Sequence, residues 1–162
     1  MSAAKGNAGE HLVMAELLAR DFDAYWADRG NPNFDIACFW NGSQRATRLR
    51  VKTTSDGTAV WNVKKTGLFP ELQPANDFVV VCNIKGGIRG ADIYIAPTPI
   101  VEEHLVHNHR LYCALPGKNG KPRKSDTNIR VLRFWGAPRE TNPSYGYDKK
   151  FADYREAWQL LK

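Results

Sequence analysis

The sequence predicts an α/β domain with a mixed central β-sheet flanked by helices. The chain has 162 residues, the size of one domain, and its 43% hydrophobic and 25% charged residues are typical of globular proteins. Helical periodicity occurs near both ends of the chain and in its middle. The runs between are strand-like, and Phe78-Val79-Val80-Val81-Cys82 has the continuous apolar character of a strand buried on both faces. This order of elements predicts one domain over residues 1–162.

The first predicted element is a helix over residues 9–21. Its apolar side comprises Val13, Met14, Leu17 and Leu18. At 100° per residue Glu10 lies on the same side, so a carboxylate is placed on the stripe that faces the core. Asn7 is a candidate N-cap, and Gly6 and Gly9 allow the start of the helix to approach another backbone closely.

A β-hairpin is predicted next, after a short strand at 23–27. Residues 33–40 form one strand, and residues 45–54 return beside it. Between them Asn41-Gly42 is a turn signal, because both residues tolerate positive φ.

Strand alternation places an acid on the basic face of this hairpin. Arg48, Arg50 and Lys52 share one face of the second strand. With a two-residue turn Asp35 lies opposite Arg48, and a loop longer by two or four residues moves its partner to Arg50 or Lys52. In each of these cases Asp35 lies on the face of the three basic residues.

The rest of the chain predicts four more strands and two more helices. The strands cover 59–63, 77–84, 91–96 and 129–134. A helix over 98–106 begins with Thr98-Pro99, a cap followed by a first-turn proline. A terminal helix begins at Asp148, and its apolar stripe comprises Phe151, Tyr154, Trp158 and Leu161.

Positive charge is concentrated in one stretch. The chain has 23 Lys and Arg against 17 Asp and Glu, a formal net charge of +6, and seven of these basic residues lie between Arg110 and Arg133 with Asp126 as the one acid. A local basic surface binds polyanions, most commonly nucleic acid, through counterion release. The alternative is a solvated loop. The candidate contacts with a polyanion are Lys64, Lys65, Lys118, Lys121, Arg123 and Lys124.

The cellular location is predicted from apolar runs and cysteines. No apolar run reaches the roughly 20 residues of a membrane span, and residues 1–6 lack the apolar core of a signal peptide. Two of the three cysteines, Cys38 and Cys82, lie in apolar runs, as buried free thiols do in a reducing compartment. We therefore expect a cytoplasmic protein with no membrane partner.

Three short motifs occur in a characteristic order. They are Gly9-Glu10 on the first helix, Phe34-Asp35 on a strand, and Arg50-Val51-Lys52-Thr53 on the next strand. In this order the chain resembles the PD-(D/E)XK nuclease superfamily, which has the restriction-endonuclease-like fold. The resemblance implies an endonuclease that hydrolyses DNA with Mg²⁺ or Mn²⁺.

The resemblance also implies roles for individual residues. Glu10 and Asp35 would be metal ligands, Lys52 would position the attacking water, and Arg50 would contact the scissile phosphate or its neighbour. DNA would be the partner, and a homodimer is consistent with nucleases of this fold. These residue types also suit phosphodiester hydrolysis on physical grounds that do not depend on the resemblance, because a cation held by carboxylates offsets the negative charge that develops in the reaction.

Arg50 departs from the family pattern, which has an acid or a glutamine two residues before the lysine. A guanidinium does not bind Mg²⁺, and its charge opposes a dication. Another acid, Asp56, Glu71 or Asp77, is a candidate for the missing ligand. The alternative is a catalytically inactive nuclease-fold protein that binds nucleic acid or a protein partner.

Ordinary structural roles compete with these assignments. An acid such as Glu10 near a helix N-terminus gains about 0.3–1 kcal/mol from the helix dipole. Asp35 opposite an arginine is also a plain cross-strand ion pair. What favours the functional interpretation is the ordered set, so the three residues must converge in one pocket that is open to solvent.

Overall fold

The fold is an α/β arrangement of two sheets and flanking helices. The structure, a computed structural model, describes residues 3–28, 30–117, 120–121, 123, 127–137, 139 and 142–162. The helices are α1 (Ala3–Leu18), α2 (Thr98–Ala114) and α3 (Tyr147–Lys150), with short 3₁₀ turns η1 (Ile88–Gly90), η3 (Ala152–Tyr154) and η4 (Trp158–Leu161). The strands are β1 (Phe22–Trp26), β2 (Ile36–Trp40), β3 (Thr47–Thr54), β4 (Thr58–Asn62), β5 (Asp77–Asn83), β6 (Asp92–Pro97) and β7 (Ile129–Arg133).

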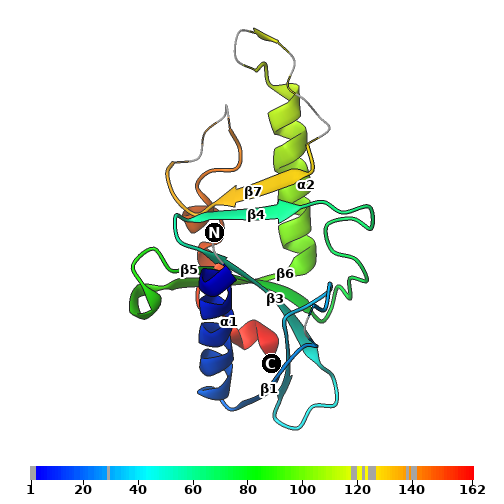
Figure 1. Cartoon of the computed structure of the whole chain (residues 1–162), viewed down its shortest axis with the longest axis vertical. Helices are drawn as coiled ribbons and strands as arrows, with labels where there is room; N and C mark the ends of the chain where they lie inside the picture. The colour runs from blue at the N-terminus through cyan, green and yellow to red at the C-terminus, as the bar shows by residue number, and fades with distance from the viewer. Residues whose placement is uncertain are drawn as a thin grey trace.

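The larger sheet is mixed, as predicted. Its five strands lie in the order β1-β2-β3-β5-β6, and β3 and β5 are parallel whereas the other neighbours are antiparallel. A separate antiparallel pair, β4-β7, crosses beside α2 (Figure 1). The predicted α/β class is therefore confirmed. No helix within the described ranges is long and apolar enough to cross a membrane.

Two hydrophobic cores lie on the two faces of the larger sheet. The first contains Val13, Met14 and Leu17 of α1, and the second contains residues of α2, β4 and β7. Leu18, also predicted for the apolar side of this helix, is instead 54% exposed at its last residue. In β5, Val80 and Cys82 belong to the first core, while Val79 and Val81 belong to the second. This alternation confirms that β5 is buried on both faces.

A close contact joins α1 to β3. A Cβ atom added at Gly9 would lie 2.0 Å from Thr53 Oγ1, so only glycine permits this approach. The Thr53 hydroxyl also donates a hydrogen bond to the Gly6 carbonyl at 3.0 Å. The close approach predicted for Gly9 is confirmed, whereas a Cβ added at Gly6 would meet nothing within 4 Å. The contact at Gly9 places the next residue, Glu10, in the same cavity as the end of β3.

The bounds of two predicted helices were wrong. Helix α1 begins at Ala3, not at residue 9, so Asn7 lies inside the helix and does not cap it. The helix ends at Leu18, shortly before Asp21, which has a φ of 60°. Helix α2 continues to Ala114, well past the predicted end at 106. Most residues in the two added stretches are exposed, so burial does not account for the greater length of either helix.

The predicted terminal helix is instead broken into α3, η3 and η4. Three of its four stripe residues are buried and Tyr154 is partly buried, but Phe151 packs in the second core whereas Trp158 and Leu161 pack in the first. Between them Glu156 adopts a φ of 50°, and its N–H donates to the Ile93 carbonyl at 2.9 Å. A continuous helix presents one stripe in one direction, so it cannot serve cores on opposite faces of a sheet.

Candidate functional site

Three elements position the three predicted site residues. Glu10 lies on α1, Asp35 immediately precedes β2, and Lys52 lies on β3. The β2–β3 register pairs Ile36 with Leu49, which places Asp35 beside Arg50. This is the register predicted for a loop two residues longer than a two-residue turn.

Backbone hydrogen bonds fix the orientation of Asp35. Its N–H donates to the Leu49 carbonyl at 2.8 Å, and its Oδ2 accepts a hydrogen bond from the Val51 N–H at 2.7 Å. The carboxylate is thereby held at the central strand of the sheet, half-buried. An acid held this firmly before any ligand arrives is preorganised for binding.

A cavity of about 450 Å³ opens between α1, the end of β3 and the start of β4. Glu10, Lys52, Asp56 and Thr58 are among the residues that line it. Asp35 is not a lining residue, but its charge raises the pKa of Glu10, after the larger effect of burial. The structure therefore brings Glu10 and Lys52 into one cavity with Asp35 next to it.

Burial dominates the electrostatics of Asp35 and Lys52. It raises the pKa of Asp35, although the Val51 hydrogen bond and the positive charges of Arg50 and Lys52 act in the opposite direction. It also lowers the pKa of Lys52, with a further contribution from Arg50 and partial compensation by Asp35. The lysine Nζ lies 5.8 Å from the centroid of the Trp61 ring, which supplies part of this low-polarity environment.

The charges at this site suit a small divalent cation. Burial raises the pKa of both carboxyl groups, and Asp35 raises that of Glu10 further, so a cation close to both would relieve an unfavourable arrangement of negative charge. Within the described part of the chain, no group of three or more His, Cys, Asp and Glu side chains is placed to hold a metal. Because Mg²⁺ retains several waters, two carboxylates fit it as protein ligands.

Of the three acids considered for the missing ligand, only Asp56 shares the cavity with Glu10 and Lys52. Its Oδ1 accepts hydrogen bonds from the Thr58 N–H at 2.8 Å and the Thr54 hydroxyl at 2.9 Å. The Thr58 bond in particular lowers the pKa of Asp56, so its carboxylate is ionised. From the sequence Asp56 was one of three candidate acids, and nothing in the sequence distinguished it from Glu71 and Asp77.

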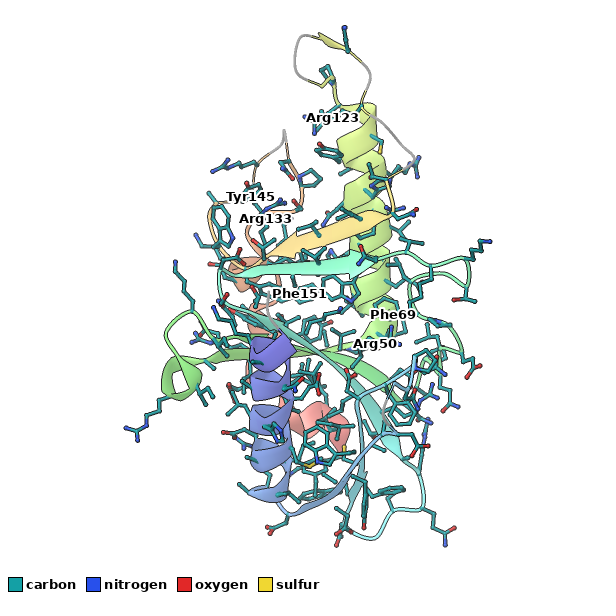
Figure 2. All side chains as sticks on the ribbon, viewed as in Figure 1. Arg50, Phe69, Arg123, Arg133, Tyr145 and Phe151 are labelled. Carbon is teal, nitrogen blue, oxygen red and sulfur yellow. The ribbon has the colours of Figure 1, made fainter. Side chains whose placement is uncertain are left out.

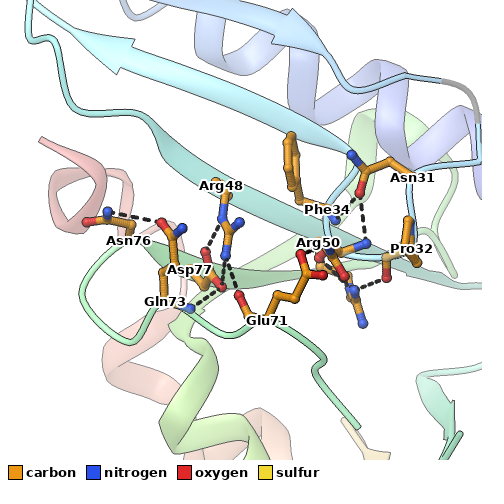
Figure 3. A network of polar contacts seen from close by, with 10 residues as sticks. Asn31, Pro32, Phe34, Arg48, Arg50, Glu71, Gln73, Asn76 and Asp77 are labelled. Carbon is orange, nitrogen blue, oxygen red and sulfur yellow. Dashed lines mark hydrogen bonds and ion pairs between the residues drawn. The ribbon is translucent and has the colours of Figure 1, made fainter. Parts of the chain in front are cut away.

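The other two acids have structural partners. Asp77 forms an ion pair with Arg48, with oxygen–nitrogen distances of 2.6 and 2.7 Å. Glu71 accepts a hydrogen bond from the Asn33 side chain at 2.7 Å. Figure 3 shows both acids in a network at the start of β5, and neither lines the cavity of Glu10 and Lys52.

Arg50 is not brought into the cavity. Its guanidinium donates to the carbonyls of Asn33, Pro32 and Leu68, and it lies 5.5 Å from the centroid of the Phe69 ring (Figures 2 and 3). These carbonyls accept four hydrogen bonds in all, which use most of the N–H donors of the guanidinium and link the segment before β2 to β3. Arg50 thus has a structural role here, and contact with a phosphate stays a prediction.

The predicted basic contacts lie in two separate places. Lys64 and Lys65 are exposed after β4, and the charge of Lys64 contributes to the lowered pKa of Lys52. Lys121 is exposed beyond the end of α2, where Arg123 lies 3.9 Å from the centroid of the Tyr112 ring. Figure 2 shows Arg123 far from Arg50. Lys118 and Lys124 lie outside the described residues.

Comparison with known proteins bears on the fold. No family model matches the chain, and no curated protein does. A solved structure, that of the bacterial homing endonuclease I-Ssp6803I, is similar with a TM-score of 0.55 and 13% sequence identity. The match covers 99% of this chain and 92% of the endonuclease. The chain therefore has a nuclease-like fold, whereas membership of the PD-(D/E)XK superfamily stays a prediction.

Proposed function

We propose that the protein is a metal-dependent endonuclease that hydrolyses phosphodiester bonds of DNA. The observation that carries the proposal is that Glu10 and Lys52, from two elements, line one cavity, and that Asp35, from a third, lies close enough for its charge to act on both. The similarity in fold to a homing endonuclease supports it. The net charge of +6 favours a polyanionic substrate.

Glu10 and Asp35 would hold Mg²⁺ or Mn²⁺ in this proposal. The ion supplies stabilisation of the negative charge that develops on the attacking and leaving oxygens. The Val51 N–H keeps the Asp35 carboxylate in position. Burial lowers the pKa of Lys52, so its ammonium group loses a proton more readily than an exposed lysine does. Lys52 is therefore suited to orient a water and stabilise negative charge beside the scissile phosphate.

Nicking of supercoiled plasmid in Mg²⁺ or Mn²⁺ tests this proposal. We expect Lys52→Met and Asp35→Asn each to lower the nicking rate by about 10²-fold or more, the usual cost of removing one such group. Matched controls are Lys85→Met and Asp23→Asn, because both residues are exposed and neither lines the cavity. Equal nicking by the wild type and the Lys52 and Asp35 variants contradicts the enzyme proposal.

A second candidate is a nuclease-fold protein that binds nucleic acid or a protein partner without cutting. It is favoured by the lack, among the described residues, of a three-ligand metal group, and by Arg50 at the position of the family's acid. It predicts salt-sensitive DNA binding that EDTA does not change, and no nicking in either metal. A protein-binding version predicts no DNA binding at low salt.

A further inference from the structure

Four side chains form a cluster of aromatic rings and guanidinium groups beside β7. The Trp135 and Tyr145 rings meet edge to face, with centroids 4.9 Å apart and an interplanar angle of 87°. The guanidinium carbons of Arg133 and Arg139 lie 4.8 and 4.4 Å from the centroid of the Tyr145 ring. Figure 2 shows Arg133 and Tyr145 side by side near the end of β7. We call these four residues the Trp135 platform.

The Trp135 platform is attached to the wall of the candidate catalytic cavity. The indole Nε1 of Trp135 donates a hydrogen bond to Thr58 Oγ1 at 3.3 Å, and Thr58 lines the cavity. The indole also lies directly over Gly57, where an added Cβ would come within 2.7 Å of Trp135 Cδ1. Trp135 therefore adjoins the cavity at Thr58.

The Trp135 platform has the chemistry that recognises an unpaired nucleotide strand. Trp135 is 39% exposed although its indole N–H is bound to Thr58, so part of this aromatic residue is accessible from solvent. Neither Arg133 nor Arg139 forms an ion pair with a carboxylate among the residues that the structure describes. Tyr145 holds two cations next to the indole. Exposed rings that stack on bases, next to cations that contact phosphates, are typical of sites for single strands.

We propose that the Trp135 platform binds an unpaired stretch of the DNA strand that leaves the cavity, with one base stacked on Trp135 and the adjoining phosphates against Arg133 and Arg139. The proposal rests on the proposed function, because it takes the bound strand to be the substrate. A base within a duplex has both faces covered by its neighbours, so stacking on Trp135 requires a base that is unpaired. The preferred substrate is therefore single-stranded DNA or duplex DNA with unpaired nucleotides next to the cleavage site.

Fluorescence anisotropy with a labelled single-stranded oligonucleotide and its duplex tests this proposal, in EDTA so that no cleavage intervenes. We expect Trp135→Ala to weaken binding of the single strand by about 10-fold and binding of the duplex much less. Trp135→Phe retains a ring and should keep most of the affinity. Trp26→Ala is the matched control, because Trp26 is 46% exposed but lies on edge strand β1, where its ring contacts His11.

Arg139→Gln gives a second measurement that does not depend on the tryptophan. Arg139 is exposed, so the variant should fold, and we expect the slope of log K against log salt for single-strand binding to become shallower by about 0.7. Wild-type affinity of both Trp135→Ala and Arg139→Gln overturns the proposal, as does an equal loss in Trp26→Ala. Absence of nicking by the wild type in either metal, with its single-strand binding intact, would count against the proposed function and leave the proposal for the Trp135 platform standing.

Discussion

Individual residues at the candidate site carry charge in places where burial opposes it. Asp35 receives a hydrogen bond from Val51 and faces two cations, yet its pKa is still raised because burial outweighs both effects. Lys52 shows the opposite shift for the same reason. Residues with shifted pKa values next to a cavity are more common at functional sites than elsewhere. They also make the protein's stability sensitive to pH and to cations.

The pH dependence of stability should change in Asp35→Asn. A carboxyl group with a raised pKa in the native state binds more protons there than in the unfolded chain, so stability falls as the pH rises from its ordinary pKa, near 3.8, through the native pKa. The variant cannot ionise, and its amide oxygen can still accept from Val51. We therefore expect it to be more stable than the wild type at pH 7 in EDTA, with the difference vanishing below about pH 3.

Urea unfolding at several pH values measures this difference. Added Mg²⁺ should then stabilise the wild type and leave Asp35→Asn unchanged, because a ligand that binds only the native state raises stability. A variant that is less stable than the wild type at pH 7, or one that Mg²⁺ stabilises equally, would show that Asp35 has an ordinary structural role.

Gly9 offers a test of the contact that positions Glu10. In Gly9→Ala the new methyl would lie 2.0 Å from Thr53 Oγ1, so the helix must move away from β3. We expect a loss of about 2 kcal/mol in the free energy of unfolding, measured with urea. The matched control is Gly6→Ala on the same helix, where an added Cβ meets nothing within 4 Å and helix propensity favours alanine by up to about 1 kcal/mol. Equal stability of the two variants would contradict the close packing.

At the scale of elements, the parallel pair β3 and β5 organises the site. Lys52 pairs with Val81 in this register, and β5 separates the two cores. The pair begins with an ion pair that joins Arg48 on β3 to Asp77 on β5. Asp77 also accepts a hydrogen bond from the Gln73 N–H at 2.8 Å, which anchors the segment that enters β5.

Removal of the Asp77 carboxylate should lower the free energy of unfolding far more than removal of an exposed carboxylate. The Arg48 and Asp77 side chains are only 14% and 13% exposed, so Asp77→Ala leaves a largely buried guanidinium without its partner. We expect a loss of about 3 kcal/mol in urea unfolding. Asp92→Ala, which breaks the exposed pair with Arg155, should cost less than about 1 kcal/mol. Similar costs for both variants would argue against this role of Asp77.

At the scale of the whole molecule, positive charge is spread over surfaces that are far apart. Lys64 and Lys65 follow the end of β4, whereas Lys121 and Arg123 lie beyond the end of α2. The β4-β7 pair lies between the start of α1 and the far end of α2 in the view of Figure 1. The contribution of each surface can be measured separately through its salt dependence.

The salt dependence of duplex binding should respond to Lys64 and Lys65. Each phosphate contact steepens the slope of log K against log salt by about 0.9, so Lys64→Gln/Lys65→Gln should reduce the slope by about 2. Lys121→Gln/Arg123→Gln tests the surface beyond α2 in the same way. Lys85→Gln, an exposed lysine after β5, is the control and should leave the slope unchanged. A wild-type slope in the first variant would show that Lys64 and Lys65 face solvent only.

The alternation of polar and apolar residues was enough to predict the strands and the face of the hairpin on which Asp35 lies. Alternation alone placed Asp35 on the face of Arg48, Arg50 and Lys52, and the observed register is one of the three allowed. Where the prediction was wrong, distant packing decided. The terminal helix was wrong because Phe151 and Trp158 belong to different cores, a division that no local period contains.

The sequence by itself determined the α/β class, the strand alternation and the order of Glu10, Asp35 and Lys52 along the chain, because these depend on spacing between near neighbours. Only the tertiary structure decided that Asp56 shares a cavity with Glu10 and Lys52, that Arg50 is hydrogen-bonded to backbone carbonyls, and that Trp135 lies against Thr58. Those contacts join residues up to 77 positions apart. Such contacts follow from the packing of two sheets and their helices, which fixes distances that sequence spacing does not.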